Sequence, residues 1–348
     1  MTQERKKFSP ERLRDFCATI LEKAKAHPED AAVVADSMIY ADLRGVSSHG
    51  LTRLDAYLKR IEAGVLNREA KMPLLRDSPA CALMDAENGF GQVAGVKAVD
   101  LAVCKAESIG VGIVAVKNSN HFGVSAYYAV RATRRNMAAI VFTNAGPAMV
   151  PFNGTEPLLG TNPFTAAVPS STDVPMVLDM ATTQVARGKV RRAAAAGNSI
   201  PLGWAVDKDG NPTTDAKAAL EGTLCPMGGP KGSGLSLMID LFSGVLSGSC
   251  LTGDVKGVTD TSGVARVGHL FIVINPAFFS GTGKFMDDVE SVGQRILGQR
   301  PADGGRIYLP GEIEAENEQA NACGLALAPD TFAQINACAA RYGVGPLE

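Results

Sequence analysis

The sequence lacks the charge pattern and the long apolar runs that mark several classes of protein. Its 34 Lys and Arg residues nearly balance its 36 Asp and Glu residues, and no basic stripe is present, so we expect no nucleic-acid or membrane surface. The most apolar stretch, residues 235–248, is too short to span a bilayer and contains Asp240. We expect it to form a buried helix in which Gly244 and Gly248 let another element approach closely.

Cysteine pairs and targeting signals are also missing. The seven cysteines are odd in number and include no CxxC spacing. The charged start of the chain carries no apolar segment of signal-peptide length. We therefore expect a reduced, cytoplasmic protein, because disulfides are rare in that compartment.

Motifs for metal-dependent and serine-dependent hydrolysis are absent as well. The chain contains neither HExxH nor GxSxG, and its four histidines are not at metal-ligand spacings, so we expect no metal site. With no metal and no obvious nucleophile, the leading chemistry is proton transfer coupled to a bound cofactor.

Two glycine-containing patterns resemble known ligand-binding loops but differ from them at required positions. Gly89, Gly91 and Gly95 follow an expected strand, but the third glycine stands one place late for a Rossmann dinucleotide loop. The loop from Asp207 resembles a calcium site but has Pro212 where the sixth position requires glycine. A hairpin turn explains the second pattern better.

Helix and strand signals alternate, which predicts an α/β fold with a mixed sheet. We expect helices at 11–26, 29–43, 92–109, 125–135, 184–196, 282–298 and 329–343, and a helix capped at Ser47 or Ser48 that ends near Ala63. Strands are expected at 81–87, 111–116, 137–144, 163–169, 175–181 and 269–275. Residues 1–75 and 300–348 are expected to form a mainly helical part around a central sheet part, 76–299.

The first candidate site lies in DLRGVSSHGLTRLDAY, residues 42–57. His49, Arg53 and Tyr57 are spaced i, i+4 and i+8, so in one helix they would share a face. A histidine in the first helical turn would have a lowered pKa, because the helix dipole disfavours the imidazolium. Ser48 is placed to hydrogen-bond its ring, and Arg53 to bind a carboxylate. An ordinary surface helix with a capping serine would explain the same residues. Spacing alone does not decide between this interpretation and a functional site.

The second candidate is SNHFG, which contains His121. It follows the apolar strand 111–116, and ligands in α/β proteins bind beyond the carboxyl ends of strands. A polar turn with a satisfied histidine is the alternative.

The third candidate is GGPKGSG, residues 228–234, which leads into the apolar segment from Leu235. Its backbone N–H groups, a helix N-terminus and Lys231 would suit a pyrophosphate or a carboxylate. It does not match the Walker pattern, and a structural glycine turn is the alternative.

Together these segments resemble the malate/L-lactate dehydrogenase family. This family is separate from the Rossmann-fold dehydrogenases and includes ureidoglycolate dehydrogenase, sulfolactate dehydrogenase, diketogulonate reductase and a cyclic-imine reductase. The resemblance covers nearly the whole chain, through ADLRGVSSHGLTRL, SNHFG, VPFNGTEPLLGTNP, LDMATT, GKV, IPLGWAVDKDGNPTTD, GGPKGSGLSLMIDLFSGVLSG, GHLFIVINPAFF and YLPGE. It implies a non-Rossmann nicotinamide-binding fold on a mixed sheet, with helical N- and C-terminal segments packed together.

The resemblance also implies an NAD(P)-dependent oxidoreductase, a small anionic 2-hydroxy or 2-oxo acid as substrate, and a homodimer that helps to complete the site. By position, Ser48 and His49 match the family's proton-relay pair, and His121 matches a catalytic histidine. The matching substrate-contacting residues are Arg53, Tyr57 and Thr161. The matching cofactor-contacting residues are His121, Phe122, Gly123, Val124, Ser125, Asn144, Asp179, Met180, Ala181, Lys231 and Gly232. On this basis the helical part carries substrate and dimer contacts, and the sheet part binds the cofactor.

The expected reaction is reversible hydride transfer between NAD(P) and an acid of the malate, lactate, ureidoglycolate or sulfolactate type. Cyclic-imine reductases are similar to this chain, but carry a relay aspartate where Lys189 stands, which favours hydroxy-acid chemistry here. NADPH-dependent imine reduction remains an alternative. From a different class, a nucleotide- or small-acid-binding protein without turnover would share the glycine loop but would not need two histidines. Which histidine carries the proton stays open at this point.

Overall fold

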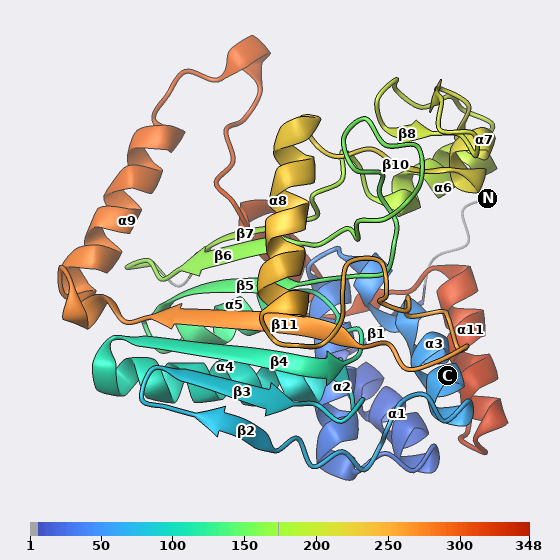
Figure 1. The fold of residues 1–348 in the computed structure, drawn as a ribbon, viewed down its shortest axis with the longest axis horizontal. Helices are drawn as coiled ribbons and strands as arrows, with labels where there is room; N and C mark the ends of the chain where they lie inside the picture. Colours follow the sequence, from blue (N-terminus) through green and yellow to red (C-terminus); the bar gives the residue numbers. More distant parts are fainter. Residues whose placement is uncertain (1–5, 173) are drawn as a thin grey trace.

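The computed structural model describes residues 6–172 and 174–348 and has a mixed α/β fold (Figure 1). Its helices are α1 (Pro10–Lys23), α2 (Pro28–Leu43), α3 (Leu54–Glu62), α4 (Gly91–Ile109), α5 (Ala126–Thr133), α6 (Arg187–Ala195), α7 (Ala216–Glu221), α8 (Pro230–Asp240), α9 (Thr282–Leu297), α10 (Glu312–Asn321) and α11 (Pro329–Arg341). Its strands are β1 (Lys7–Phe8), β2 (Leu74–Asp77), β3 (Cys81–Asp85), β4 (Val111–Ser119), β5 (Ala138–Thr143), β6 (Phe164–Val168), β7 (Met176–Met180), β8 (Ala205–Val206), β9 (Pro212–Thr213), β10 (Thr223–Leu224), β11 (Val267–Ile274) and β12 (Leu325–Ala326). The predicted α/β class is confirmed.

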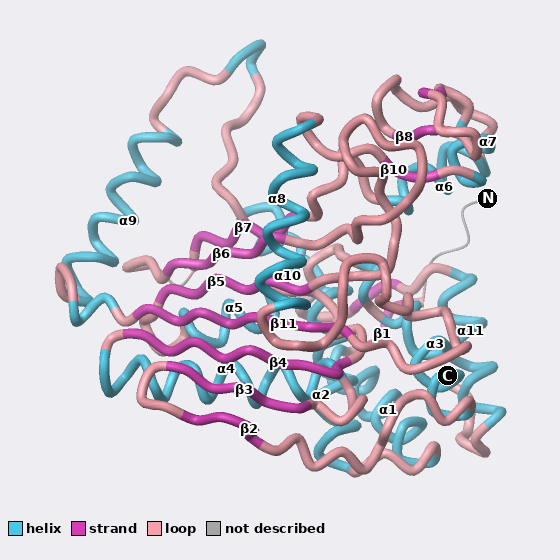
Figure 2. The backbone as a smooth tube through the Cα atoms, in the orientation of Figure 1, coloured by secondary structure: helices cyan, strands magenta, loops and turns pink. Residues whose placement is uncertain are grey.

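A seven-stranded sheet in the order β2-β3-β4-β11-β5-β6-β7 forms the centre of the molecule (Figure 2). β3 and β4 pair in parallel, whereas the other neighbouring strands pair antiparallel, which confirms the mixed sheet. β4 and β5 both run antiparallel to β11, which lies between them. Their carboxyl ends therefore meet at one edge of the sheet, beside the start of β11, and this edge carries the candidate site.

The helices from the two ends of the chain pack together, as predicted. One continuous core joins residues of α1, α2 and α4 to the central strands and to Ile335 and Cys338 of α11. β1 pairs with β12, and the rings of Phe8 and Phe332 stack with centroids 5.8 Å apart. An ion pair of 3.0 Å between Asp55 and Arg341 links α3 to α11.

A small unit around α6, α7 and strands β8 to β10 has its own apolar core, which includes Val190, Ile200 and Leu224. It lies at the upper right of Figure 1. The loop from Asp207 is the β8–β9 hairpin, as predicted. The Asp207 carboxylate accepts hydrogen bonds of 2.9 Å from the N–H groups of Asp209 and Asn211, and Gly210 supplies a φ of 82°.

The predicted single helix from Ser47 to Ala63 is wrong. Two 3-10 turns, Ser47–His49 and Leu51–Arg53, precede α3 and are separated by Gly50, whose φ of -87° and ψ of -146° are not helical. The cause is Asp42, whose carboxylate accepts the N–H of Leu51 at 2.8 Å and lies 2.2 Å from where a Cβ on Gly50 would stand. The one-face argument for His49, Arg53 and Tyr57 therefore does not hold.

The apolar segment 235–248 is only partly as predicted. α8 already begins at Pro230 and continues into a π-helix, Leu241–Val245, which packs on the start of β11. Its other face is exposed rather than buried, at Leu237, Met238, Leu241, Phe242, Val245 and Leu246. Gly244 does permit a close approach, because a Cβ there would lie 2.5 Å from Nδ2 of Asn144. Gly248 instead supplies a φ of 69°.

Candidate active site

Two histidines from distant segments meet at the edge of the sheet. His49 belongs to the 3-10 turn Ser47–His49 and His121 to the loop after β4. Their rings stack with centroids 5.4 Å apart and an interplanar angle of 16°, so the predicted meeting of the two imidazoles is confirmed. Tyr57 of α3 joins them, since its hydroxyl lies 2.8 Å from Nδ1 of His121.

Hydrogen bonds constrain which ring nitrogen carries the proton. The N–H of Gly123 donates to Nδ1 of His121 at 3.4 Å, so this nitrogen is an acceptor and the neutral ring holds its proton on Nε2. Nδ1 of His49 lies 2.9 Å from the hydroxyl of Ser48, which confirms the predicted Ser48–His49 contact. A hydroxyl can donate or accept, so the ring of His49 can leave Nε2 free to take a proton.

Both imidazoles are held in the neutral form. Burial, and to a smaller extent the nearby charge of Arg53, together lower the pKa of His49 to about 4. Burial also lowers the pKa of His121 well below its usual value, with smaller contributions from His49 and Arg53. The predicted direction for His49 is therefore confirmed, but the predicted cause is wrong, because no α-helix begins at that residue.

Arg53 lies beside the imidazoles and is only partly exposed. Its Nε donates to the carbonyl oxygen of Ser48 at 2.6 Å, which joins the two 3-10 turns. Burial lowers the pKa of Arg53, and the charge of Arg191 from α6 lowers it further. Two guanidinium groups therefore contribute positive potential on this side of the imidazoles, which favours an anionic ligand.

The SNHFG loop is fixed by the side chain of its asparagine, Asn120. The Asn120 amide donates to the carbonyl oxygens of Asn88 and Gly89 at 2.7 and 2.9 Å, and accepts from Nε of Arg60 at 3.2 Å. Gly91 lets α4 approach, because a Cβ there would lie 2.2 Å from the carbonyl oxygen of Asn120. Gly91 therefore permits close packing of α4 against the histidine loop.

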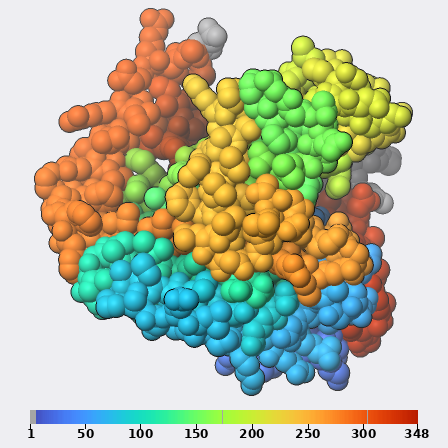
Figure 3. Space-filling model, viewed as in Figure 1, coloured from blue at the N-terminus to red at the C-terminus, as the bar shows by residue number. Residues whose placement is uncertain are grey.

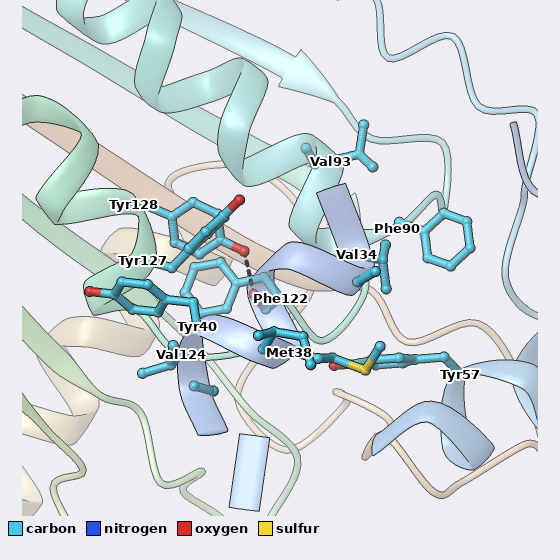
Figure 4. Close-up of a cluster of buried hydrophobic side chains, with 14 of the residues drawn as sticks. Val34, Met38, Tyr40, Tyr57, Phe90, Val93, Phe122, Val124, Tyr127 and Tyr128 are labelled. Atoms are coloured by element: carbon cyan, nitrogen blue, oxygen red, sulfur yellow. Dashed lines mark hydrogen bonds between the residues drawn. The ribbon is translucent and has the colours of Figure 1, made fainter. Parts of the chain in front are cut away.

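The segment after His121 fits a negatively charged cofactor. Gly123 has a φ of 81°, and Val124 and Ser125 lead directly into α5. The Ser125 hydroxyl is buried and has no hydrogen-bond partner among the described residues. A buried hydroxyl at a helix N-terminus requires a partner, and a phosphate oxygen of a dinucleotide would supply one. The Phe122 side chain is not available to the cofactor, because it is 2% exposed and its ring stacks against Tyr128 in the core (Figure 4).

Backbone hydrogen bonds join the remaining predicted cofactor segments to one another and to the predicted substrate residue Thr161. The N–H of Thr182 donates to the carbonyl oxygen of Thr161 at 3.0 Å, which ties the end of β7 to GTNP. The N–H of Met227 donates to the carbonyl oxygen of Thr182 at 2.9 Å, which ties GGPKGSG to the same strand end. Asp179 accepts the N–H of Ala126 at 2.8 Å and so reaches the start of α5. Met180 and Ala181 are partly exposed beside it.

Of three further predicted cofactor residues, two occupy structural positions and the third is exposed. Asn144 donates to Asp240 at 2.8 Å and accepts the N–H of Gly268 at 2.8 Å, so its amide is already satisfied. Gly232 is buried, and a Cβ there would lie 2.3 Å from the carbonyl oxygen of Met227. Lys231 is exposed in the first turn of α8. No ion pair joins it to another residue that the structure describes.

Three residues beside this site were missed by the sequence analysis. They are Arg60, which contacts Asn120, Arg191, whose charge acts on Arg53, and His269, which contacts Ser119. Asn120 itself belongs to the predicted SNHFG candidate.

Two classes of feature are not found in residues 6–172 and 174–348. No group of three His, Cys, Asp or Glu side chains is placed to hold a metal ion there. None of the helices in those ranges combines the length and apolar character needed to cross a membrane.

Comparison with known proteins identifies the family of the chain. Residues 8–336 match the malate/L-lactate dehydrogenase family. L-sulfolactate dehydrogenase of Methanocaldococcus jannaschii is 40% identical over 328 residues, which cover 94% of this chain and 95% of that protein. Ureidoglycolate dehydrogenase (NAD(+)) of Escherichia coli O157:H7 is 37% identical over 94% of both chains. The solved structure of the M. jannaschii sulfolactate dehydrogenase superposes with a TM-score of 0.93, at 39% identity over 98% of both chains. The chain belongs to the malate/L-lactate dehydrogenase family.

Proposed function

We propose that His49 and His121 act together on the reacting oxygen of a small 2-hydroxy or 2-oxo acid. The chain is an NAD(P)-dependent 2-hydroxy acid dehydrogenase. The observation that carries the proposal is the pair of neutral imidazoles with centroids 5.4 Å apart, beside the guanidinium of Arg53. This combination offers a proton acceptor, a hydrogen-bond donor and a carboxylate ligand at one place.

The hydrogen bonds of the two imidazoles assign a different role to each ring. His49 takes the hydroxyl proton during oxidation, because a ring that donates from Nδ1 to Ser48 leaves Nε2 unprotonated. His121 carries its proton on Nε2 and donates a hydrogen bond to the same oxygen, because its Nδ1 accepts from Gly123. In the reductive direction His49 returns the proton. Arg53 binds the carboxylate and orients the carbon.

The residues that fit NAD or NADP are the backbone of Gly123 to Ser125, the Ser125 hydroxyl, and the strand end at Met180 and Ala181. Lys231 adds a positive charge at the start of α8. When bound, the nicotinamide supplies the hydride acceptor or donor. The chain's own contribution is to hold the acid and to move its proton.

A substrate panel tests this function. Malate, lactate, ureidoglycolate and sulfolactate are each assayed with NAD and NADP by the absorbance of the reduced cofactor, and a cyclic imino acid is assayed with NADPH. Turnover of at least one hydroxy acid supports the proposal. Turnover of the imine alone would move the function to imine reduction. No turnover with any of these, together with tight nucleotide binding, would favour a binding protein.

Replacing Arg53 with glutamine is expected to raise KM for the acid about 10- to 100-fold, because a partly exposed ion pair contributes about 2 kcal/mol to binding. KM for the cofactor should change little. Steady-state kinetics at saturating cofactor provide the measurement. Arg192→Gln, on the exposed surface of α6, is the matched loss of one positive charge and should leave KM unchanged. An unchanged KM in Arg53→Gln would remove Arg53 from the site.

The pKa of His49 predicts an unusually acidic limit for oxidation. A pKa of about 4 keeps the imidazole neutral, and so able to accept a proton, throughout pH 5 to 7. The acid limb of kcat/KM for hydroxy-acid oxidation is therefore expected nearer pH 4 than pH 6.5. Arg53→Gln should move the limb to higher pH, because it removes a charge that opposes protonation. The profile is measured with short exposures and a return to pH 7 as a control for unfolding. A limb at pH 6.5 or above would contradict this assignment.

We also propose a homodimer and a cytoplasmic location. The apolar face of α8 and the π-helix after it is exposed, and Leu246 reaches 60%. α9 projects from the body beside a hollow in the surface (Figure 3), and it exposes Val292 and Ile296 at 51% and 43%. Apolar surfaces of this kind mark protein contacts, and a second copy offers matching ones. All seven cysteines are free, as expected in a reducing compartment.

A further inference from the structure

His269 is a third histidine close to the candidate site, and each of its ring nitrogens lies within hydrogen-bond distance of a hydroxyl group. It lies near the start of β11, is 0% exposed, and plays no part in the proposed mechanism. Its Nδ1 lies 2.7 Å from the hydroxyl of Thr143 and its Nε2 lies 2.8 Å from the hydroxyl of Ser119. Ser119 ends β4 and Thr143 ends β5. One imidazole therefore joins the ends of the three central strands.

The bond to Ser119 lies where the strand pairing is irregular. Val267 pairs with Ser119, but His269 pairs with Val116, so the register between β11 and β4 shifts between these positions. Regular backbone bonding is interrupted at such a bulge, and bulges often stand beside active sites. The His269 side chain therefore supplies the cross-strand bond at the point where β4 delivers the chain to His121, two residues beyond Ser119.

His269 also contacts Phe122, the residue that follows His121. The ring of Phe122 lies between His269, at 4.4 Å with an interplanar angle of 3°, and Tyr128, at 4.7 Å with an angle of 25°. Figure 4 shows Tyr128 beside Phe122, and the Tyr128 hydroxyl donates to the Phe122 carbonyl oxygen. Side chains on both sides of His121, those of Ser119 and Phe122, thus contact His269.

Stability alone does not explain an imidazole at this position. Burial disfavours its charged form and lowers its pKa to about 3, so it contributes no ion pair. An apolar ring of similar size would fill the same space without two nitrogens that require partners. What the imidazole adds is a fixed distance to two hydroxyl groups on neighbouring strands.

We propose that His269 is a positioning residue that sets the place and orientation of His121 through Ser119 and Phe122. The inference rests on the proposed role of His121. It predicts that the bond to Ser119, rather than the bond to Thr143, controls His121, because Ser119 is the partner on the same strand as the histidine loop.

Three substitutions distinguish the packing of the His269 ring from each of its two hydrogen bonds. His269→Phe keeps a ring against Phe122 but removes both hydrogen bonds, His269→Asn places an amide near the position of Nδ1, and His269→Gln places one near Nε2. We expect kcat to fall about 10- to 100-fold in His269→Phe, with KM within about 3-fold, because misplacement of a catalytic group acts on the chemical step. His269→Gln should recover more of kcat than His269→Asn. Val273→Ala, equally buried on the same strand, should lower stability and leave kcat unchanged.

A second readout does not depend on turnover. The chain has four histidines, so nitrogen-15 NMR of histidine-labelled protein without cofactor resolves each ring. His269→Phe and Ser119→Ala should both shift the His121 resonances, whereas those of the exposed His27 should stay in place. Ser119→Ala keeps the His269 ring and serves if His269→Phe fails to fold. Wild-type kcat with unshifted His121 resonances would overturn the proposal. Shifted resonances with wild-type turnover in His121→Ala would instead overturn the catalytic role of His121.

Discussion

Replacing His49 with alanine is expected to lower kcat for hydroxy-acid oxidation by about 10²- to 10⁴-fold, the usual contribution of general acid–base catalysis. The physical reason is that His49 is the ring able to present an unprotonated Nε2, through its contact with Ser48. Cofactor affinity should stay near that of the wild type, because the dinucleotide-fitting segments lie after His121 and at the end of β7. Stopped-flow single turnovers and cofactor fluorescence titrations measure the two quantities separately.

Conservative replacements distinguish the two rings. His49→Gln should be nearly as slow as His49→Ala, because an amide is too weakly basic to take the hydroxyl proton. His121→Gln should retain more activity than His121→Ala, because its amide N–H can replace the donor on Nε2. His27→Gln, at an exposed position, is the matched control and should match the wild type. Equal turnover in His49→Ala and the wild type would exclude His49 as the proton carrier, and the reverse order of the two glutamine variants would exchange the roles.

Much of the fold could be predicted from the sequence, because the signals for its helices and strands are local. Apolar runs bounded by glycine or polar residues predicted the central strands, and capping residues and amphipathic spacing predicted most helices. The two imidazoles were also predictable, because each stands in a polar cluster beside an apolar element. Their meeting follows from topology, since β4 delivers His121 to the edge where the turns before α3 place His49.

The features that sequence analysis missed depend on contacts across the fold. The carboxylate of Asp42 occupies the space beside Gly50 and interrupts the expected helix, but no local pattern joins these two residues. The bonds of His269 to Ser119 and Thr143 span three strands whose order is not sequential. The exposed face of α8 resembles a core helix in sequence, because apolar spacing along a helix does not indicate whether another element of the chain covers that face.

Replacing Arg60 with methionine is expected to lower the free energy of unfolding by about 1.5 to 3 kcal/mol, the contribution of hydrogen bonds from a charged group. Arg60 is 1% exposed on α3, and its guanidinium donates to the carbonyl oxygens of Gly257 at 3.5 Å, Gly263 at 3.3 Å and Asp260. Its Nε also donates to Asn120 at 3.2 Å. Methionine fills similar space but leaves these acceptors without the guanidinium donor. Among them Asn120 is buried, and an unsatisfied buried acceptor costs about 1 to 3 kcal/mol.

Urea unfolding followed by circular dichroism measures this loss as a lower midpoint at an unchanged slope. Arg60→Lys should lose less, since an ammonium group can still donate to part of the set. Arg76→Met, at an exposed position on β2, should stay within about 0.5 kcal/mol of the wild type. Because Asn120 adjoins His121, Arg60→Met should also lower kcat under conditions in which the variant remains folded. A midpoint equal to that of the wild type would mean that the loop 257–263 and Asn120 do not depend on the guanidinium, and that the histidine loop is held by Asn88 and Gly89 alone.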